Sequence, residues 1–271
     1  MEKYTVAICG MGISGAFIAR ACKDYATYAG VEIDITVIAD TKGSIPSAAF
    51  WLRKVPDSVA NGFYAQNITI SSWGSREEYI RKQWGEQIEG YTSSFPNEVK
   101  VEKGFFAVNP IDVLLAGIKL SWLSVKVTQN ILAATARSTD LVFVTFPTAD
   151  SIEERRKFLL MYPVVSNPIV NQFAQNELIY VGVPGRMVRI TKLRNYFAVE
   201  YTHDHKVNMD NISDNNVVSY VQDMHPLTPE ITFNELPWDN VFPVGRFAQF
   251  KRSMLSHEAY DRAWEILKLI A

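Results

Sequence analysis

Three glycines near the start of the chain have the spacing that most directly suggests chemistry. Residues 10–15 are Gly-Met-Gly-Ile-Ser-Gly, which is the pattern G-x-G-x-x-G. In a dinucleotide-binding turn, the first glycine permits the tight bend and the second lets the backbone approach a pyrophosphate. The third lets a helix pack closely on a strand. The residues expected to contact a dinucleotide are therefore Gly10, Gly12, Ile13, Ser14 and Gly15.

The segments around this turn have the composition that the motif needs. Residues 4–9 and 31–39 are apolar and rich in β-branched side chains, which is typical of buried parallel strands, and residues 16–28 have helical periodicity. A helix that begins at the turn offers N–H groups and a positive dipole end to phosphates. Asp40 follows the second strand and can accept hydrogen bonds from ribose hydroxyls, whereas it would repel a 2′-phosphate. A glycine turn in a core without any ligand is the alternative interpretation.

Elements farther along the chain indicate a change of sheet type. The pattern predicts a helix over 111–123 with Asn109 as its cap, a short strand over 125–127 and an apolar strand over 141–146. Three β-rich runs between residues 178 and 201 are separated by turn-prone pairs, which predicts an antiparallel meander. The predicted elements end with an amphipathic helix over 254–270.

Later segments resemble those of the flavin amine oxidases and UDP-galactopyranose mutases. Residues 140–147, Asp-Leu-Val-Phe-Val-Thr-Phe-Pro, resemble the strand that lies against the cofactor in that family. Residues 245–248, Gly-Arg-Phe-Ala, resemble its late G-R-x-x segment, which a helix follows, and residues 125–127 match its adenine-contacting strand. The resemblance implies FAD as the cofactor, with further contacts from Val127, Thr145, Gly245, Arg246, Met254 and Leu255.

The same resemblance implies a substrate region and a domain arrangement. Arg189, with Arg186 as the alternative, corresponds to a strand arginine that faces substrate in the mutases, and a guanidinium suits a carboxylate or phosphate. The fold class expected is α/β, a Rossmann-like FAD-binding domain with an inserted antiparallel β substrate region. The FAD-binding domain would comprise residues 1–60, 100–160 and 238–271, and the substrate or cap region residues 61–99 and 161–237.

This chain departs from the family in two respects. Residues 40–44, Asp-Thr-Lys-Gly-Ser, lack the arginine and the Gly-Gly pair that follow the ribose-binding acid in flavin amine oxidases. The chain is also much shorter than members of either family, and it is similar in this respect to small flavoproteins encoded by bacteriophages.

Together with the glycine motif, the resemblance to these flavoenzymes implies an FAD-dependent oxidoreductase with a small-molecule or nucleotide substrate. The expected reaction removes hydride from a C–N bond of an amine or amino-acid-like compound, and an amino-modified nucleotide of phage DNA modification is one candidate. A mutase-like enzyme that uses reduced flavin without net oxidation is the first alternative. A non-catalytic dinucleotide-binding protein is the second. The sequence identifies no acid–base side chain and leaves the oligomeric state open.

The composition argues against several other classes of protein. The 271 residues include 27 basic and 29 acidic side chains, and a net charge of −2 does not indicate nucleic-acid binding. Cys9 and Cys22 are too few to cross-link a chain of this length, which favours a reducing compartment. Because no apolar run approaches the roughly 18–20 residues of a membrane span, a soluble cytoplasmic protein without a membrane partner is expected.

Other polar residues have less specific patterns. His203 and His205 have no third ligand at a recognisable spacing, so no metal site is expected. Arg53 or Lys54 would either pass near the flavin or form exposed surface charges. The basic residues Arg76, Arg81 and Lys82 are interleaved with Glu77 and Glu78, which predicts a solvated helix face and not a DNA-binding patch.

Overall fold

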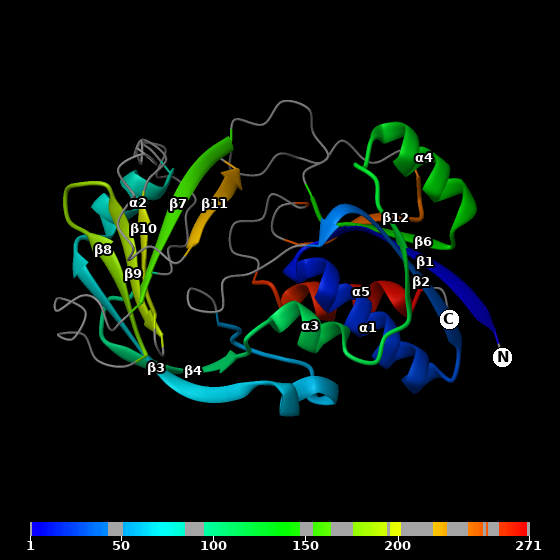
Figure 1. Ribbon diagram of the computed structural model, residues 1–271, viewed down its shortest axis with the longest axis horizontal. Coiled ribbons are helices and arrows are strands. Elements are labelled where there is room, and N and C mark those ends of the chain that lie inside the picture. Colours follow the sequence, from blue (N-terminus) through cyan, green and yellow to red (C-terminus); the bar gives the residue numbers. More distant parts are fainter. Residues whose placement is uncertain are drawn as a thin grey trace.

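A computed structural model of the chain shows two β-sheets with associated helices (Figure 1). It describes residues 2–42, 51–84, 95–146, 154–163, 176–193, 196–201, 219–226, 238–245, 248 and 255–269. Within this part of the chain, no helix combines the length and the apolar character that a membrane crossing requires.

The first sheet is parallel throughout and has five strands in the order β12-β6-β1-β2-β5. Four consecutive residues of β1, from Val6 to Cys9, are almost completely buried. Burial on both faces is the usual state of a parallel sheet, because helices cover both sides, and it explains the continuous apolar runs in the sequence. The strands are β1 (Lys3–Met11), β2 (Glu32–Lys42), β5 (Leu120–Leu123), β6 (Leu141–Val144) and β12 (Val241–Pro243).

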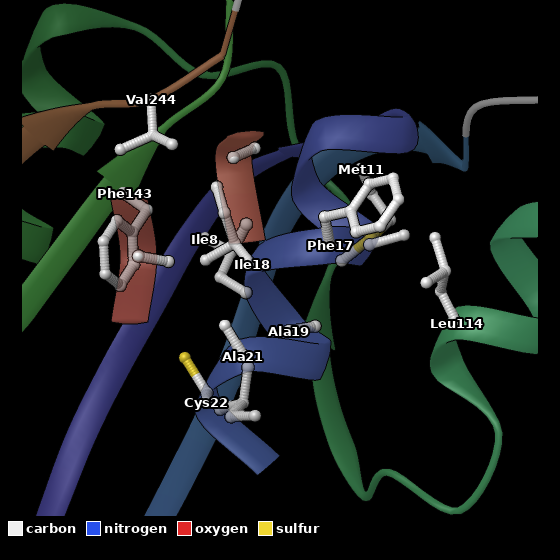
Figure 2. Packing of buried hydrophobic residues seen from close by; sticks show 14 of the residues in the cluster. Ile8, Met11, Phe17, Ile18, Ala19, Ala21, Cys22, Leu114, Phe143 and Val244 are labelled. Carbon is white, nitrogen blue, oxygen red and sulfur yellow. The ribbon is translucent and has the colours of Figure 1, made fainter. Parts of the chain in front are cut away.

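Alternate residues of β1 separate the two faces of this sheet. Ile8 packs into a cluster with helices α1 (Ile13–Ala29), α3 (Pro110–Leu115) and α5 (Glu258–Leu267). Figure 2 shows Phe17 and Ile18 of α1 in this cluster, between the strands and Leu114 of α3. Cys9 points to the other face, where α4 (Gln129–Ser138) contributes apolar side chains. The result is a three-layer α/β domain of Rossmann type.

The second sheet has seven strands in the order β11-β7-β10-β9-β8-β3-β4. All neighbouring strands are antiparallel except β3 and β8, which are parallel. Helix α2 (Arg76–Trp84) packs on it through Tyr79, whose ring centroid lies 5.3 Å from that of Tyr180. A short 3₁₀ helix, η1 (Asp57–Gly62), precedes β3. The strands are β3 (Tyr64–Gly74), β4 (Lys100–Phe106), β7 (Glu154–Pro163), β8 (Glu177–Gly182), β9 (Met187–Leu193), β10 (Tyr196–Tyr201) and β11 (Ser219–Pro226).

The fold class expected from the sequence is confirmed, including the β1-α1-β2 unit and the antiparallel meander β8-β9-β10. The predicted helix over 111–123 is wrong, because α3 ends at Leu115 and residues 120–123 form β5. Gly117, with φ of +71°, lies in the turn between them. The short strand predicted over 125–127 is likewise displaced to β5.

Two element ends also differ from prediction. Strand β6 ends at Val144, two residues earlier than predicted, although the Thr145 N–H still donates to the Cys9 carbonyl at 3.0 Å and so extends the pairing of β6 with β1. The last helix begins at Glu258, not at 254, and the Leu255 N–H donates to the Glu258 carboxylate at 2.6 Å. The second sheet includes all of β4 and β7, whereas the expected cap ranges 61–99 and 161–237 leave out β4 and residues 154–160; the domain bounds stay a prediction.

Asp140 links the beginnings of β1 and β6 and should make the free energy of unfolding depend on pH. Its carboxylate accepts hydrogen bonds from the Thr5 N–H at 2.7 Å and the Thr5 hydroxyl at 2.8 Å, which lower the pKa of Asp140. A lowered pKa in the folded state means that the stabilisation is complete above the ordinary value of 3.8 and is lost as the pH falls through the folded-state pKa.

Asp140→Ala should therefore lower the free energy of unfolding by about 1 kcal/mol at pH 7, and the difference from wild type should disappear below the folded-state pKa. Urea titrations at several pH values measure this difference. Asp34→Ala is the matched control, because Asp34 forms an exposed ion pair with Lys3 at 2.9 Å and should cost less than about 0.5 kcal/mol. A pH-independent difference for Asp140→Ala would contradict the assignment.

Candidate dinucleotide site

The candidate site lies at the carboxyl edge of the first sheet. Figure 1 shows that β1 ends, and that α1 and α5 begin, on the side of the molecule where the second sheet lies. Ligands of open α/β sheets bind outside the carboxyl ends of the strands, where the strand order reverses. Here the reversal is at β1, since β2 follows it on one side and β6 lies on the other.

Gly10 and Gly15 are required by packing within the protein. Gly10 has φ of +97°, and a Cβ there would lie 2.4 Å from the Thr145 hydroxyl oxygen. A Cβ on Gly15 would lie 2.3 Å from the backbone oxygen of Gly10. Both distances are far below van der Waals contact, so the sharp turn and the close approach of α1 to it depend on these two glycines.

Gly12 has no such internal reason to be glycine. It is exposed, its φ of −83° and ψ of −166° suit any residue, and a Cβ there would meet no described atom within 4 Å. Gly12 is also the N-cap of α1, where no described side chain caps the helix and the first turn holds no acidic residue. The turn thus leaves open space beside the positive end of a 17-residue helix, which suits the close approach of a pyrophosphate.

Residues from the far end of the sequence meet this turn. Gly245, with φ of +106°, approaches Ser14 so closely that a Cβ on Gly245 would lie 2.8 Å from the Ser14 hydroxyl oxygen. The Val244 N–H donates to the Val144 carbonyl at 2.8 Å, which continues the alignment of β12 with β6. The Thr145 hydroxyl donates to the Cys9 carbonyl at 3.0 Å. Gly10, Ser14, Thr145 and Gly245 are therefore neighbours, as the sequence order of the three segments suggested.

Asp40 and Val127 lie beside the same edge. Asp40 is exposed near the end of β2, which pairs with β1 up to the level of Met11. The Ser124 hydroxyl donates to the Asp40 carbonyl at 3.4 Å, so the loop after β5 lies next to it. Val127 follows in this loop and packs, partly buried, against the cluster beneath α4. Ile13 begins α1 and is also partly buried.

The two arginines predicted to face a substrate belong to the second sheet and one of its turns. Arg189 is engaged in an ion pair with Glu200 of the neighbouring strand, and its buried Nε has no hydrogen-bond partner among the described residues. Arg186 is exposed in the turn between β8 and β9, two strands of the second sheet. Arg246 and Met254 lie outside the described residues, and Leu255 uses its N–H for Glu258. The cofactor and substrate contacts expected of these residues stay predictions.

Lys82 is a residue whose role the sequence pattern missed. Its side chain is buried and its ammonium donates to the Val183 and Met187 carbonyls at 2.8 and 2.6 Å, so it fastens α2 to the β8–β9 turn that carries Arg186. Burial lowers the pKa of Lys82. The predicted solvated helix face is therefore wrong at this residue, because the neighbouring charges gave no signal of what packs against it.

Other candidate residues have structural partners. Burial raises the pKa of both cysteine thiols, Cys9 and Cys22, to about 12, which agrees with inert core thiols. Arg53 pairs with Glu102 at 3.1 Å and Lys54 with Asp261 at 3.4 Å. His203 and His205 lie outside the described residues, and the described ones contain no group of three side chains suited to a metal.

The comparisons with known proteins identify the fold. No protein-family model and no curated protein sequence matches this chain. The chain is similar to the solved structure of a RebC variant, RebC-10x, native and bound to K252c, with a TM-score of 0.57 and 10% identity; the match covers 100% of this chain and 61% of that one. It is also similar to the flavin-dependent brominase Bmp2, with a TM-score of 0.53 and 10% identity over 99% of this chain and 79% of the other.

A third similar structure is the tryptophan 6-halogenase SttH of Streptomyces toxytricini, with a TM-score of 0.51 and 9% identity over 92% of this chain and 68% of the other. At such low identity the likeness is one of fold. This chain spans about three fifths of the length of RebC-10x. The chain shares its α/β fold, with a Rossmann-like parallel sheet and a second, mostly antiparallel sheet, with these structures, one of which is a flavin-dependent brominase.

Proposed function

We propose that the chain is an FAD-dependent oxidoreductase. The observation that carries this proposal is the open space at Gly12, beside an uncapped helix end, in a turn whose other glycines are held by internal packing. A glycine that no described residue requires is explained by a ligand that must come close to the backbone. The likeness in fold to a flavin-dependent brominase supports a flavin as the dinucleotide.

The residues present at the edge suit the pyrophosphate and the adenosine ribose of FAD. The N–H groups in the first turn of α1, at Ile13 and Ser14, would hold the pyrophosphate, and Gly12 would let it approach. The exposed carboxylate of Asp40 would accept hydrogen bonds from the adenosine ribose. A bound flavin supplies the redox chemistry, whereas the chain contributes binding, orientation and the surrounding electrostatics.

The substrate class is the finer part of the proposal. The resemblance to flavin amine oxidases favours oxidation of a C–N bond in an amine or amino-acid-like compound, with Arg186 or Arg189 recognising an anionic group of the substrate. The similarity of fold to a brominase and a halogenase favours a second candidate, halogenation of an aromatic substrate, for which a bound flavin would supply the chemistry of oxygen activation, with an external reductant and a halide as co-substrates. The two reactions differ in what reduces the flavin.

The test begins with the purified chain. Absorbance in the flavin bands and mass spectrometry of the released cofactor should identify FAD. An anaerobic titration with a panel of primary amines and amino acids should then bleach the flavin if the substrate is its reductant. Bleaching only by an added nicotinamide or flavin reductant supports the halogenase-like candidate. Sugar-nucleotide isomerisation only after reduction supports the mutase, and a protein that binds no dinucleotide refutes the proposal.

A further inference from the structure

A second concave site lies at the other end of α1 from the glycine motif. It is a cavity of about 610 Å³ between the C-terminal half of α1, the segment 54–58 and α5. Asp24, which lines it, comes twelve residues after Gly12, and a helix rises about 1.5 Å per residue, so the two are roughly 18 Å apart along the helix. The cavity is therefore separate from the dinucleotide site, and its size suits a small molecule.

The floor of the cavity is a carboxylate held in a fixed orientation. One oxygen of Asp24 accepts hydrogen bonds from the Ser58 hydroxyl at 2.6 Å and the Tyr260 hydroxyl at 3.0 Å. The other faces Arg20 at 3.5 Å. Burial, followed by the nearby Asp24 charge, raises the pKa of Tyr260, so its hydroxyl stays protonated and continues to donate. Because a carboxylate can accept about four hydrogen bonds, Asp24 keeps capacity for another donor.

The surrounding charges leave the cavity negative. The Arg20 guanidinium is directed mainly to the α3 end, where it donates to the Leu114 and Ala116 carbonyls at 2.8 and 2.5 Å. Lys54, at the rim, is offset by Asp261 at 3.4 Å, and both of these side chains are more than half exposed. Asp57 adds an exposed carboxylate to the lining. This balance favours a cationic ligand over an anionic one.

The wall of the cavity is aromatic. Tyr28 lies at its edge with 77% of its surface exposed, and its ring centroid is 5.6 Å from that of Trp264. Tyr260 stacks on the same indole at 5.9 Å with an interplanar angle of 23°. Aromatic faces attract cations and also supply area for a flat apolar group. An exposed tyrosine supported by a fixed indole is thus available for both contacts.

We propose that this cavity binds a small organic cation, an ammonium or guanidinium group on a flat apolar body, with the charge directed to Asp24 and the body against Tyr28. The inference does not depend on the flavin, because no lining residue belongs to the dinucleotide site.

Three probes that share one ring and differ in charge test the proposal: benzylamine, benzyl alcohol and benzoate. Each is titrated into the full chain while amide NMR shifts of residues 24–28 and 54–58 are followed. The benzylammonium ion should bind with a Kd of about 1–10 mM, the alcohol about tenfold more weakly, and benzoate not at all. Equal binding of benzoate, or no binding of benzylamine up to about 50 mM, overturns the proposal.

Matched variants locate the site. Tyr28→Ala should weaken benzylamine binding about fivefold without affecting the fold, because this side chain is largely exposed. Lys54→Ala should tighten it about two- to threefold, since it removes a competing cation. Tyr64→Ala on β3, which is also an exposed tyrosine, is the control and should change nothing. Equal effects of the two tyrosine variants, or weaker binding by Lys54→Ala, would show that the cavity is not the binding site.

Discussion

Gly12→Val should give a folded protein that has lost its dinucleotide. Valine is compatible with the extended backbone at Gly12, and a Cβ there would meet no described atom within 4 Å, so the fold should change little beyond a modest cost at the helix cap. The isopropyl group would occupy the space that the pyrophosphate needs. We expect FAD affinity to fall at least about 100-fold, which corresponds to about 2.7 kcal/mol.

The measurement is the ratio of bound FAD to protein after gel filtration, with circular dichroism and a thermal melt to verify folding. Asn109→Val is the matched control, because Asn109 is also the N-cap of a helix, α3, and its side chain accepts the Asp112 N–H at 3.4 Å. This control should lose about 1 kcal/mol of stability and keep its cofactor. A Gly12→Val protein loaded as fully as wild type would remove the turn from the binding site.

Gly15→Ala should act on folding stability and not on cofactor contact: it should lower the free energy of unfolding. The added methyl group would lie 2.3 Å from the Gly10 backbone oxygen, and a backbone atom cannot swing aside as a flexible side chain can. Either α1 or the turn must move, although α1 is buried almost continuously from Gly15 to Cys22. We expect a loss of about 3 kcal/mol or more in the free energy of unfolding.

Chemical denaturation of the protein freed of cofactor measures this loss without a contribution from ligand binding. Gly12→Ala makes the same chemical change three residues earlier, in open space, and should cost less than about 1 kcal/mol. Equal unfolding midpoints for the two alanine variants would be inconsistent with the packing described at Gly15.

The sequence could predict the parts of the fold in which local pattern and final packing coincide. The first strand, the glycine turn and α1 are contiguous, so the spacing of Gly10, Gly12 and Gly15 was enough to locate the turn. The prediction of a helix over 111–123 was wrong because the apolar residues of α3 and β5, taken together, have the spacing of one amphipathic helix. The discriminating residue was Gly117, whose left-handed backbone ends the helical continuation.

Long-range features had no comparable local signal. Nothing near Lys82 indicates that its ammonium caps the carbonyls of Val183 and Met187, about a hundred residues away. The pairing of β3 with β8 is equally distant, and so the extent of the second sheet could not be derived from single segments. The approach of Gly245 to Ser14 was anticipated only through the order of family-like segments, because residue types alone do not specify which distant turns meet.

The close approach of Gly245 to Ser14 also constrains how the chain folds during its synthesis. Gly245 and the turn at Gly10 to Gly15 come from opposite ends of the printed sequence, and β12 and α5 complete a sheet and a helical layer that β1 and α1 begin. During translation the early unit emerges with its apolar face uncovered and must wait for partners that are synthesised more than 200 residues later. Nascent chains would therefore depend on chaperones until β12 and α5 have left the ribosome, and only then could they acquire the cofactor.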